Sequence, residues 1–552
     1  MRRETLKNAA VSTLVGATLV TGVVLLAPGW GERDGAPAGP AARALAAAGA
    51  GAPAAPADLK ALIGDREDRV RARPDDAGAW AVLGAAYVER AARTGDFALY
   101  PKADRALRRS LAVRPAREGN VGAVVGLGAL ANARHDWAAG RSWGEQARKL
   151  DPTSWAAYPV LVDACNGLGD HGAAGKAMDT LQELASGPQV KGREALIYRD
   201  KGWREDAAAL AYDAALTSST RWEKAAALGR QGELAWERGE AAEALEHHEA
   251  ALKEDPEARR ALAGRARALA ALGRTGEAQR DWRTVLEELP LAEYALEAGE
   301  LDDALGLDGD AGVRYAQVRT LAAKAREHGV DQDLVLARYE ADHGDPAAAV
   351  RRLQGEWRQG HRSVHVADAM GWALYRAGRA EEALPFAKLA TGQGLRSALF
   401  SYHRGEIERE LGSYGAARRH LEEALRTNPG FSPLLAPAAR EALDDMGEPA
   451  PGGPANLWGD GPDEITRGDE PEPAKPKPSE TKPAEAGAGK AGDGGTGASP
   501  AATAAAPASA ATGAGAGAAS PSAGGTTAAR ATPPRSAPGA ASPSPAGSTG
   551  PR

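Results

Sequence analysis

One short motif in the sequence could carry a nucleophilic serine if it lay on a suitable scaffold. Gly140, Ser142 and Gly144 match the G-x-S-x-G pattern of serine hydrolases. That chemistry requires a buried strand before the serine, so that a strained turn presents the hydroxyl group. The residues before Gly140 belong instead to a helical repeat, which places the motif within a helix. The sequence therefore predicts no catalytic serine here.

A glycine-rich stretch could in principle cradle a dinucleotide. Residues 126–131 read GLGALA and follow two valines, as a dinucleotide-binding turn would. No alternation of strands and helices surrounds them, and the repeat pattern explains Gly128 as a small residue where two helices meet. We expect no cofactor for this chain.

Two pairs of histidines lie close enough in the sequence to suggest metal ligands. His361 and His365 are four residues apart, a spacing that can place both on one helix face, but Arg362 stands where a zinc protease needs glutamate. No third ligand is evident in the sequence. His247 and His248 are expected on the polar side of a helix. The sequence thus predicts no metal site and no catalytic residue.

An internal repeat indicates the helices on which these residues lie. The repeat is clearest between residues 223 and 290. Three pairs of residues recur 34 positions apart there: Gly239 and Gly273, Ala244 and Ala278, Pro256 and Pro290. Two further sets keep the same step over three units: Gly344, Gly378 and Gly412, and Ala349, Ala383 and Ala417. A fixed period of about 34 residues is typical of stacked helix–turn–helix units.

The unit that begins at Asp76 carries the most specific pattern. Trp80, Leu83, Gly84 and Tyr87 form W-x2-L-G-x2-Y, and here the chain resembles the tetratricopeptide repeat (TPR) family. The resemblance implies an all-α solenoid of nine or ten helix–turn–helix repeats over residues 58–446, with residues 431–446 as a capping helix.

The resemblance also implies a concave groove that binds a protein or peptide. In the family, defined positions of the first helix of each repeat face that groove. Carried over by register, they are Glu233, Trp236, Glu237, Arg267, Trp372, Tyr375, Arg376, Tyr402, Glu406 and Arg409. Aromatic and arginine side chains dominate binding hot spots, which favours these positions for partner binding. The alternative is that the aromatic residues only pack against neighbouring helices.

The two ends of the chain differ from the repeats. Residues 1–30 contain an uncharged apolar stretch, 9–27, after a basic start, which predicts a membrane anchor or a cleaved signal peptide. Either would place the bulk of the chain outside the cytoplasm. Residues 31–57 are predicted to be a flexible linker, and residues 447–552, rich in Pro, Ala, Gly, Ser and Thr, a disordered tail.

Composition limits the function further. The net charge of −7 and the pI near 5.9 give no reason to expect nucleic acid as a partner. The single cysteine, Cys165, excludes a disulfide framework and is expected to be a small buried hydrophobe. We therefore expect a non-enzymatic scaffold that binds a protein or peptide outside the cytoplasm. Two alternatives stay open: an enzyme or enzyme subunit acting on the cell envelope, and a cytosolic regulator whose apolar start is a buried helix.

Overall fold

The computed structural model describes residues 39–447, and every regular element in that range is a helix. The first twelve α-helices are α1 (Pro40–Gly49), α2 (Pro56–Ala72), α3 (Ala77–Thr94), α4 (Leu99–Val113), α5 (Val121–Ala133), α6 (Trp137–Leu150), α7 (Ala157–Leu168), α8 (His171–Leu184), α9 (Pro188–Asp200), α10 (Arg204–Leu216), α11 (Arg221–Glu237) and α12 (Ala241–Glu254), with a short 3-10 helix η1 (Ala116–Glu118) after α4. The others are α13 (Arg259–Ala271), α14 (Thr275–Glu288), α15 (Ala292–Ala304), α16 (Asp308–Glu327), α17 (Asp333–His343), α18 (Pro346–Arg358), α19 (Val364–Arg376), α20 (Ala380–Thr391), α21 (Ala398–Glu410), α22 (Tyr414–Thr427) and α23 (Leu435–Asp445).

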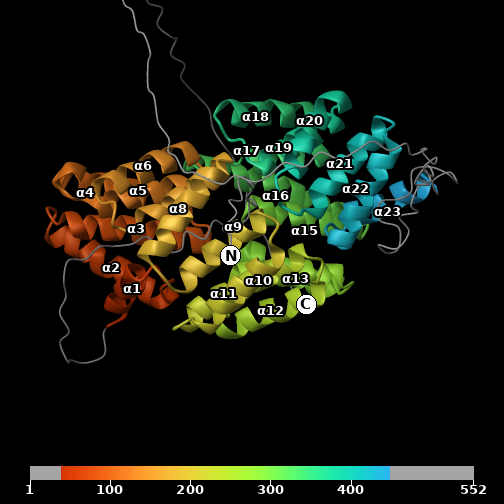
Figure 1. Ribbon diagram of the computed structural model, residues 1–552. Coiled ribbons are helices and arrows are strands. Elements are labelled where there is room, and N and C mark those ends of the chain that lie inside the picture. The colour runs from red at the N-terminus through yellow and green to blue at the C-terminus, as the bar shows by residue number, and fades with distance from the viewer. Residues whose placement is uncertain (1–38, 448–552) are drawn as a thin grey trace, which may run out of the picture. The chain divides into compact units, whose positions relative to one another are not determined.

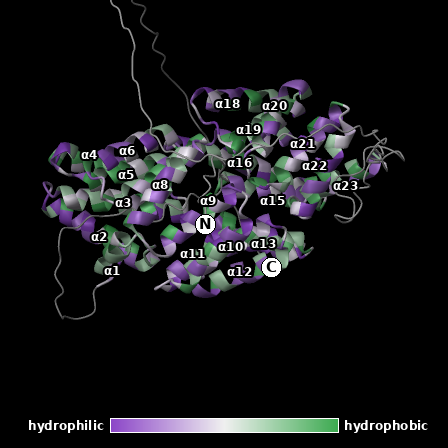
Figure 2. Cartoon of the chain, viewed as in Figure 1, coloured by the Kyte–Doolittle hydropathy of each residue, from purple (hydrophilic) through white to green (hydrophobic). Residues whose placement is uncertain are grey.

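The helices pack in series as hairpins, so that α3 pairs with α4, α5 with α6, and so on to α21 with α22 (Figure 1). These are ten helix–turn–helix repeats, with α1 and α2 before them and α23 after them. The predicted all-α solenoid is confirmed for the described residues. Hydrophobic and hydrophilic residues alternate along the helices, as expected where one face of each is buried (Figure 2).

Small residues allow the two helices of a repeat to approach closely. At least one alanine on the second helix is completely buried in each of the ten repeats: Ala103, Ala147, Ala174, Ala207, Ala244, Ala278, Ala322, Ala349, Ala383 and Ala417. On the first helix, a Cβ added to Gly84 would lie 2.5 Å from Leu107, and one added to Gly405 would lie 2.7 Å from Leu421. Larger side chains at these positions would separate the helices, which explains why the 34-residue period is marked by Gly and Ala.

The ten repeats form two coils that lie against each other. We call α3–α12 the first coil and α13–α22 the second coil. The backbone N–H of Asp331 donates to the carbonyl of Arg134 over 2.8 Å, and that of Arg362 donates to Leu168 over 3.3 Å. Asn428 Nδ2 donates to the carbonyl of Trp236 over 2.8 Å, across 192 residues of sequence. Turns within the repeats of the first coil thus dock onto the junctions between repeats of the second coil.

The docking is regular. Each docked turn meets the loop that follows the repeat five units later, so that the α5–α6 turn meets the α16–α17 loop and the α7–α8 turn meets the α18–α19 loop. The α9–α10 turn likewise meets the α20–α21 loop, where a Cβ on Gly202 would lie 2.5 Å from the carbonyl oxygen of Gly394. One full turn of the solenoid therefore takes between five and six repeats.

The prediction of a flexible linker over residues 31–57 was wrong for its described part. Residues 40–49 form α1, which packs on α2, and Ala44 and Ala48 are buried. The alanines that suggested a spacer provide the small buried face of this helix. Arg43 also forms an ion pair with Asp58, which ties α1 to α2.

Two predictions fall outside the described residues. The apolar stretch 9–27 and the tail from residue 448 onward are not described, so both stay predictions. Within residues 39–447, no helix is both long enough and apolar enough to cross a membrane.

Candidate functional site

A cavity of about 1120 Å³ lies on the inner side of the coils. Its wall comes mainly from the first helices of the repeats, including α3, α11, α13, α15, α17, α19 and α21. These are the helices from which the repeat pattern predicted a groove. Aromatic side chains contribute to the lining: Trp222, Trp236, Trp282, Tyr294, Trp372, Phe400 and Phe431. The cavity is therefore the candidate binding site.

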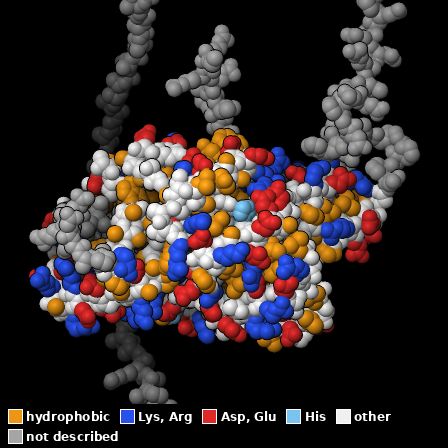
Figure 3. Space-filling view, turned by 90° about the horizontal axis from the view of Figure 1, so that it is seen from below, with side chains coloured by type: hydrophobic (Ala, Val, Ile, Leu, Met, Phe, Trp, Pro, Cys, Tyr) orange, Lys and Arg blue, Asp and Glu red, His pale blue; other side chains and the backbone are white. Residues whose placement is uncertain are grey.

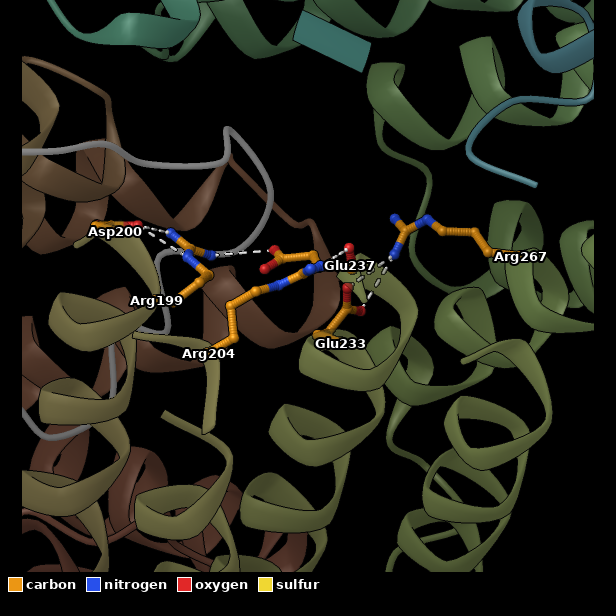
Figure 4. A network of polar contacts seen from close by, with 6 residues as sticks. All are labelled: Arg199, Asp200, Arg204, Glu233, Glu237 and Arg267. Atoms are coloured by element: carbon orange, nitrogen blue, oxygen red, sulfur yellow. Dashed lines mark hydrogen bonds and ion pairs between the residues drawn. The ribbon is translucent and has the colours of Figure 1, made fainter. Parts of the chain in front are cut away.

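An ion-pair network crosses the cavity wall from α9 to α13 (Figure 4). The guanidinium group of Arg199 donates to Asp200 over 2.6 Å and forms an ion pair with Glu237 over 3.3 Å. Arg204, at the start of α10, donates to the backbone carbonyl of Glu237. Figure 4 shows that these side chains converge from separate helices, which fixes the relative positions of α9, α10 and α11.

The network continues through Arg267 on α13. Its guanidinium group lies 3.1 Å from Glu233 and 3.0 Å from Glu297, so it joins α11 to α15. Burial acts to raise the pKa of Glu233, but Arg267 and the other positively charged neighbours together outweigh it, so the pKa is lowered. The same carboxylates hold the pKa of Arg267 well above its usual value. Both partners therefore stay charged at neutral pH.

Two cavity arginines lie beside this network without a partner. Arg230 on α11 and Arg338 on α17 line the cavity, and neither makes a hydrogen bond or ion pair within the described part of the chain. Burial and the nearby Arg199 lower the pKa of Arg230 to about 10. These two guanidinium groups are available to an acidic group of a ligand.

His248 on α12 also lines the cavity. The prediction of its position on the helix was wrong. The sequence placed it on the polar side of a helix, whereas it is 1% exposed and neither ring nitrogen has a hydrogen-bond partner. The ring fills space left by Gly232 and Gly264, whose added Cβ atoms would lie within 2.5 Å of it. Burial lowers the pKa of His248 to about 4, so the imidazole is neutral.

The predicted groove residues fall into two groups. Five of the ten line the cavity: Glu233, Trp236, Glu237, Arg267 and Trp372. The other five do not: Tyr375, Arg376, Tyr402, Glu406 and Arg409. Tyr375 and Tyr402 instead pack around Trp372, with ring centroids 5.0 and 5.7 Å from it.

Ionic contacts hold the second group in place. Arg376 and the indole Nε1 of Trp372 both donate to Asp342 on α17. Arg409 forms an ion pair with Glu406 over 2.7 Å. Trp372 is also stacked on His403, with ring centroids 4.0 Å apart. Of this cluster, Asp342, Trp372 and His403 line the cavity, and its contacts connect α17, α19 and α21.

The motifs that suggested chemistry lie within helices. Residues 140–144 belong to α6 and residues 126–131 to α5, so neither forms the strand-to-helix turn that its motif requires. Cys165 on α7 is buried, and burial raises the pKa of its thiol to about 11. A thiol with so high a pKa is a poor nucleophile at neutral pH.

The histidine pair at positions 361 and 365 does not share a helix. Helix α18 ends at Arg358 and Gly360 adopts a φ of +91°, so His361 lies in a loop and His365 lies in α19. The structure instead surrounds His361 with Glu356 and Asp331. Sequence reasoning missed this cluster because Asp331 lies 30 residues before His361, on the far side of α17 and α18.

The described residues have the TPR fold: repeated helix hairpins, small residues where the helices meet, and a cavity lined by first helices. No protein-family model matches the chain, and no curated protein matches it in sequence.

Solved structures of similar fold include a tetratricopeptide repeat protein from Parabacteroides merdae, with 19% identity and a TM-score of 0.29 over 47% of this chain and 97% of that one. Human IFIT1, in a dimer with m7Gppp-AAAA, has 16% identity and a TM-score of 0.39 over 61% and 77% of the two chains. Yeast Tom70 has 13% identity and a TM-score of 0.33 over 70% and 86%. These likenesses concern the fold alone.

Proposed function

We propose that the chain is a non-enzymatic scaffold that binds an extended peptide segment of a partner protein in the cavity between its coils. The observation that carries this proposal is the cavity lining, in which aromatic side chains alternate with charged groups of both signs. Tryptophan, tyrosine and arginine supply most of the binding energy in protein interfaces. A peptide also offers both backbone amides and charged side chains to such a lining.

The charge of the lining favours a peptide over a nucleic acid. Cationic and acidic side chains occur in nearly equal number around the cavity, and Arg199 and Arg267 are already engaged with glutamates. A nucleic-acid groove needs an excess of cations that are free to contact phosphates. The outer surface is equally mixed, since Figure 3 shows acidic and basic groups interspersed over the visible face.

The two unpartnered arginines predict the chemistry of the peptide. Arg230 and Arg338 would form charge-assisted hydrogen bonds with an acidic side chain or a terminal carboxylate. Leaving a half-buried guanidinium group without a partner costs free energy, which an acidic ligand would recover. We therefore expect peptides with at least one carboxylate next to an apolar or aromatic anchor.

A peptide-display selection against the full chain tests this proposal. Selected peptides should contain acidic residues, and the double variant Arg230→Ala/Arg338→Ala should weaken their binding at least tenfold, as measured by fluorescence anisotropy. Arg419→Ala, on the exposed face of α22, is the matched control and should bind like the wild type. Peptides that bind the double variant equally well, or a selection that yields none, would contradict the proposal.

We further propose that residues 9–27 anchor or export the chain, so that the repeats act outside the cytoplasm. The support is the uncharged 19-residue stretch behind a basic start. A fusion of residues 1–60 to a reporter that is active only after export should be active. Activity confined to the cytoplasm would overturn this part and leave the peptide-binding proposal standing.

A further inference from the structure

Three side chains with metal-binding chemistry meet beside the contact between the two coils. They are Asp331 in the α16–α17 loop, Glu356 near the end of α18, and His361 in the α18–α19 loop. One candidate ligand atom from each lies within 4.8 Å of the other two. Tetrahedral ligands of Zn²⁺ bind at about 2.0–2.2 Å and so lie about 3.4 Å from one another. Small side-chain movements would bring the three atoms to that spacing.

The cluster is buried and incompletely satisfied. Glu356 and His361 are 4% and 5% exposed, and Nδ1 of His361 lies 2.5 Å from Oε2 of Glu356. The second oxygen of Glu356, Oε1, is buried and has no hydrogen-bond partner. A buried carboxylate oxygen without a donor is costly. A cation would satisfy it and would also neutralise the second carboxylate, that of Asp331.

There is room beside these side chains. A cavity of about 110 Å³ is lined by Asp331, Glu356, His361 and His135, together with apolar residues from both coils. This volume accommodates a metal ion and a completing water molecule, because one water occupies about 30 Å³ in the liquid. The small cavity adjoins the large one, but none of the three candidate ligands lines the proposed peptide site.

His135 holds the position of the aspartate. Its Nδ1 lies 3.0 Å from the backbone carbonyl oxygen of Asp331, and the backbone N–H of Asp331 donates to Arg134. Within residues 39–447, His135 is the one residue other than glycine with a positive φ, of +61°. Positive φ is uncommon for residues other than glycine, and here the ring at this position contacts the Asp331 loop. The imidazole therefore acts as a positioning group for the Asp331 loop.

From this geometry we propose that Asp331, Glu356 and His361 form a site for a divalent metal ion of Zn²⁺ type. Imidazole and carboxylate ligands are both suited to Zn²⁺. The ion would fix the two loops that receive the first coil, since Asp331 bonds to the α5–α6 turn and Arg362, next to His361, bonds to the α7–α8 turn. The metal is thus structural, and it links the docking of two repeats.

Zn²⁺ binding to the untagged full chain tests the site. After treatment with a chelator, equilibrium dialysis against ZnCl₂ should give one Zn²⁺ per wild-type chain. Asp331→Asn, which keeps the shape of the side chain, and His361→Gln should each weaken binding at least tenfold. In the wild type alone, Zn²⁺ should also slow hydrogen exchange in the α5–α6 turn and the α16–α17 loop.

A second histidine–glutamate pair provides the matched control. Nδ1 of His420 lies 2.6 Å from Oε2 of Glu408, and within the described residues this pair belongs to no group of three potential ligands. His420→Gln should therefore bind Zn²⁺ like the wild type. If the wild type binds no Zn²⁺, or if His420→Gln loses as much affinity as Asp331→Asn, the proposal is overturned. Thermal unfolding without metal verifies that each variant is folded.

Discussion

The turns within the repeats of the two coils have the same backbone conformation but different surroundings. Gly202 and Gly239 in the first coil have φ values of +78° and +82°, and Gly378 and Gly412 in the second coil have values of +74° and +71°. A Cβ on Gly202 or Gly239 would meet backbone oxygen atoms of the second coil at 2.5 and 2.8 Å. A Cβ on Gly378 or Gly412 would have no neighbour within 4 Å.

The comparison distinguishes two reasons why glycine occupies a turn position. In the second coil, glycine is needed only because other residues are strained at positive φ. In the first coil, the absence of a side chain also allows one coil to touch the other. The two kinds of glycine look alike in the sequence, where both recur with the helical repeats. Variants at these turns can distinguish the two roles.

The largest effect is expected for Gly202→Ala. Positive-φ strain of about 1 kcal/mol and a clash with the Gly394 carbonyl of about 2 kcal/mol should together lower the free energy of unfolding by about 3 kcal/mol. Gly378→Ala, the matched variant in the second coil, should lower it by about 1 kcal/mol. Urea denaturation measures both. Equal losses would mean that the coils do not touch at this turn.

A pH-dependent effect of similar size is expected for His248, which lies where α12 of the first coil meets α13 of the second. Because burial lowers its pKa to about 4 from an unfolded value near 6.5, the unfolded state binds the extra proton between these values. Above pH 6.5 the neutral imidazole of His248 does not reduce the free energy of unfolding. As the pH falls towards 4, protonation of the unfolded state lowers the free energy of unfolding by about 3 kcal/mol.

The variant His248→Leu should reduce this slope of stability against pH, measured by urea denaturation between pH 4 and 7. Some slope should remain, since burial also lowers the pKa of His171 to about 4. The control is His247→Leu, which makes the same substitution at a neighbouring, only partly buried position of the same helix. An unchanged slope in His248→Leu would show that the ring is not desolvated.

A smaller loss is expected for Asn428→Ala at the last docked turn. Removing the amide leaves the carbonyl of Trp236 with the backbone N–H of Gly239 as its remaining donor, so the loss should be about 1 kcal/mol. Hydrogen exchange should then accelerate at the α11–α12 turn, across the contact. Asn120→Ala is the control, because Asn120 is also buried but bonds only to Ser110 and Arg114 nearby. If both variants leave exchange at the α11–α12 turn unchanged, the contact does not hold the coils together.

The smallest effect is expected for Gly412→Asn. Asparagine tolerates positive φ better than most residues, and the turn has open space around it, so the free energy of unfolding should change by less than about 1 kcal/mol. Gly239→Asn places the same side chain against Thr427 and Asn428 and should cost clearly more. Thermal unfolding measures both losses of stability. Equal losses in the two variants would show that the turns of the two coils do not differ in their surroundings.

Local features of the fold could be predicted from the sequence because they depend on local patterns. The recurrence of Gly239 and Ala244 at Gly273 and Ala278 marks the turn and the helix crossing of each repeat, and the structure contains both. Helix α1 was missed because an alanine-rich segment resembles a spacer when its packing partner is unknown. The pitch of the coil was also missed, since a 34-residue period does not fix how many repeats complete a turn.

The candidate site shows the same limit. The positions of Glu233, Trp236 and Arg267 followed from the repeat register, and all three line the cavity. The register could not show that Tyr402 and Glu406 are used in packing, because this depends on neighbouring helices. The register also could not predict that Asp331 lies close to His361. These two residues lie in the loops before α17 and after α18, and their proximity depends on how those loops fold.

The contact between the coils has a consequence for how the chain folds. Ordinary solenoids have contacts only between neighbouring repeats, so they can unfold piecemeal from an end. Here the bonds of His135 to Asp331 and of Asn428 to Trp236 span 196 and 192 residues. Such contacts close long loops, which slows folding and makes distant repeats depend on one another. We therefore expect the array to unfold in fewer, larger steps than its repeat number suggests, and a chain that ends before α22 to leave the α11–α12 turn without its support.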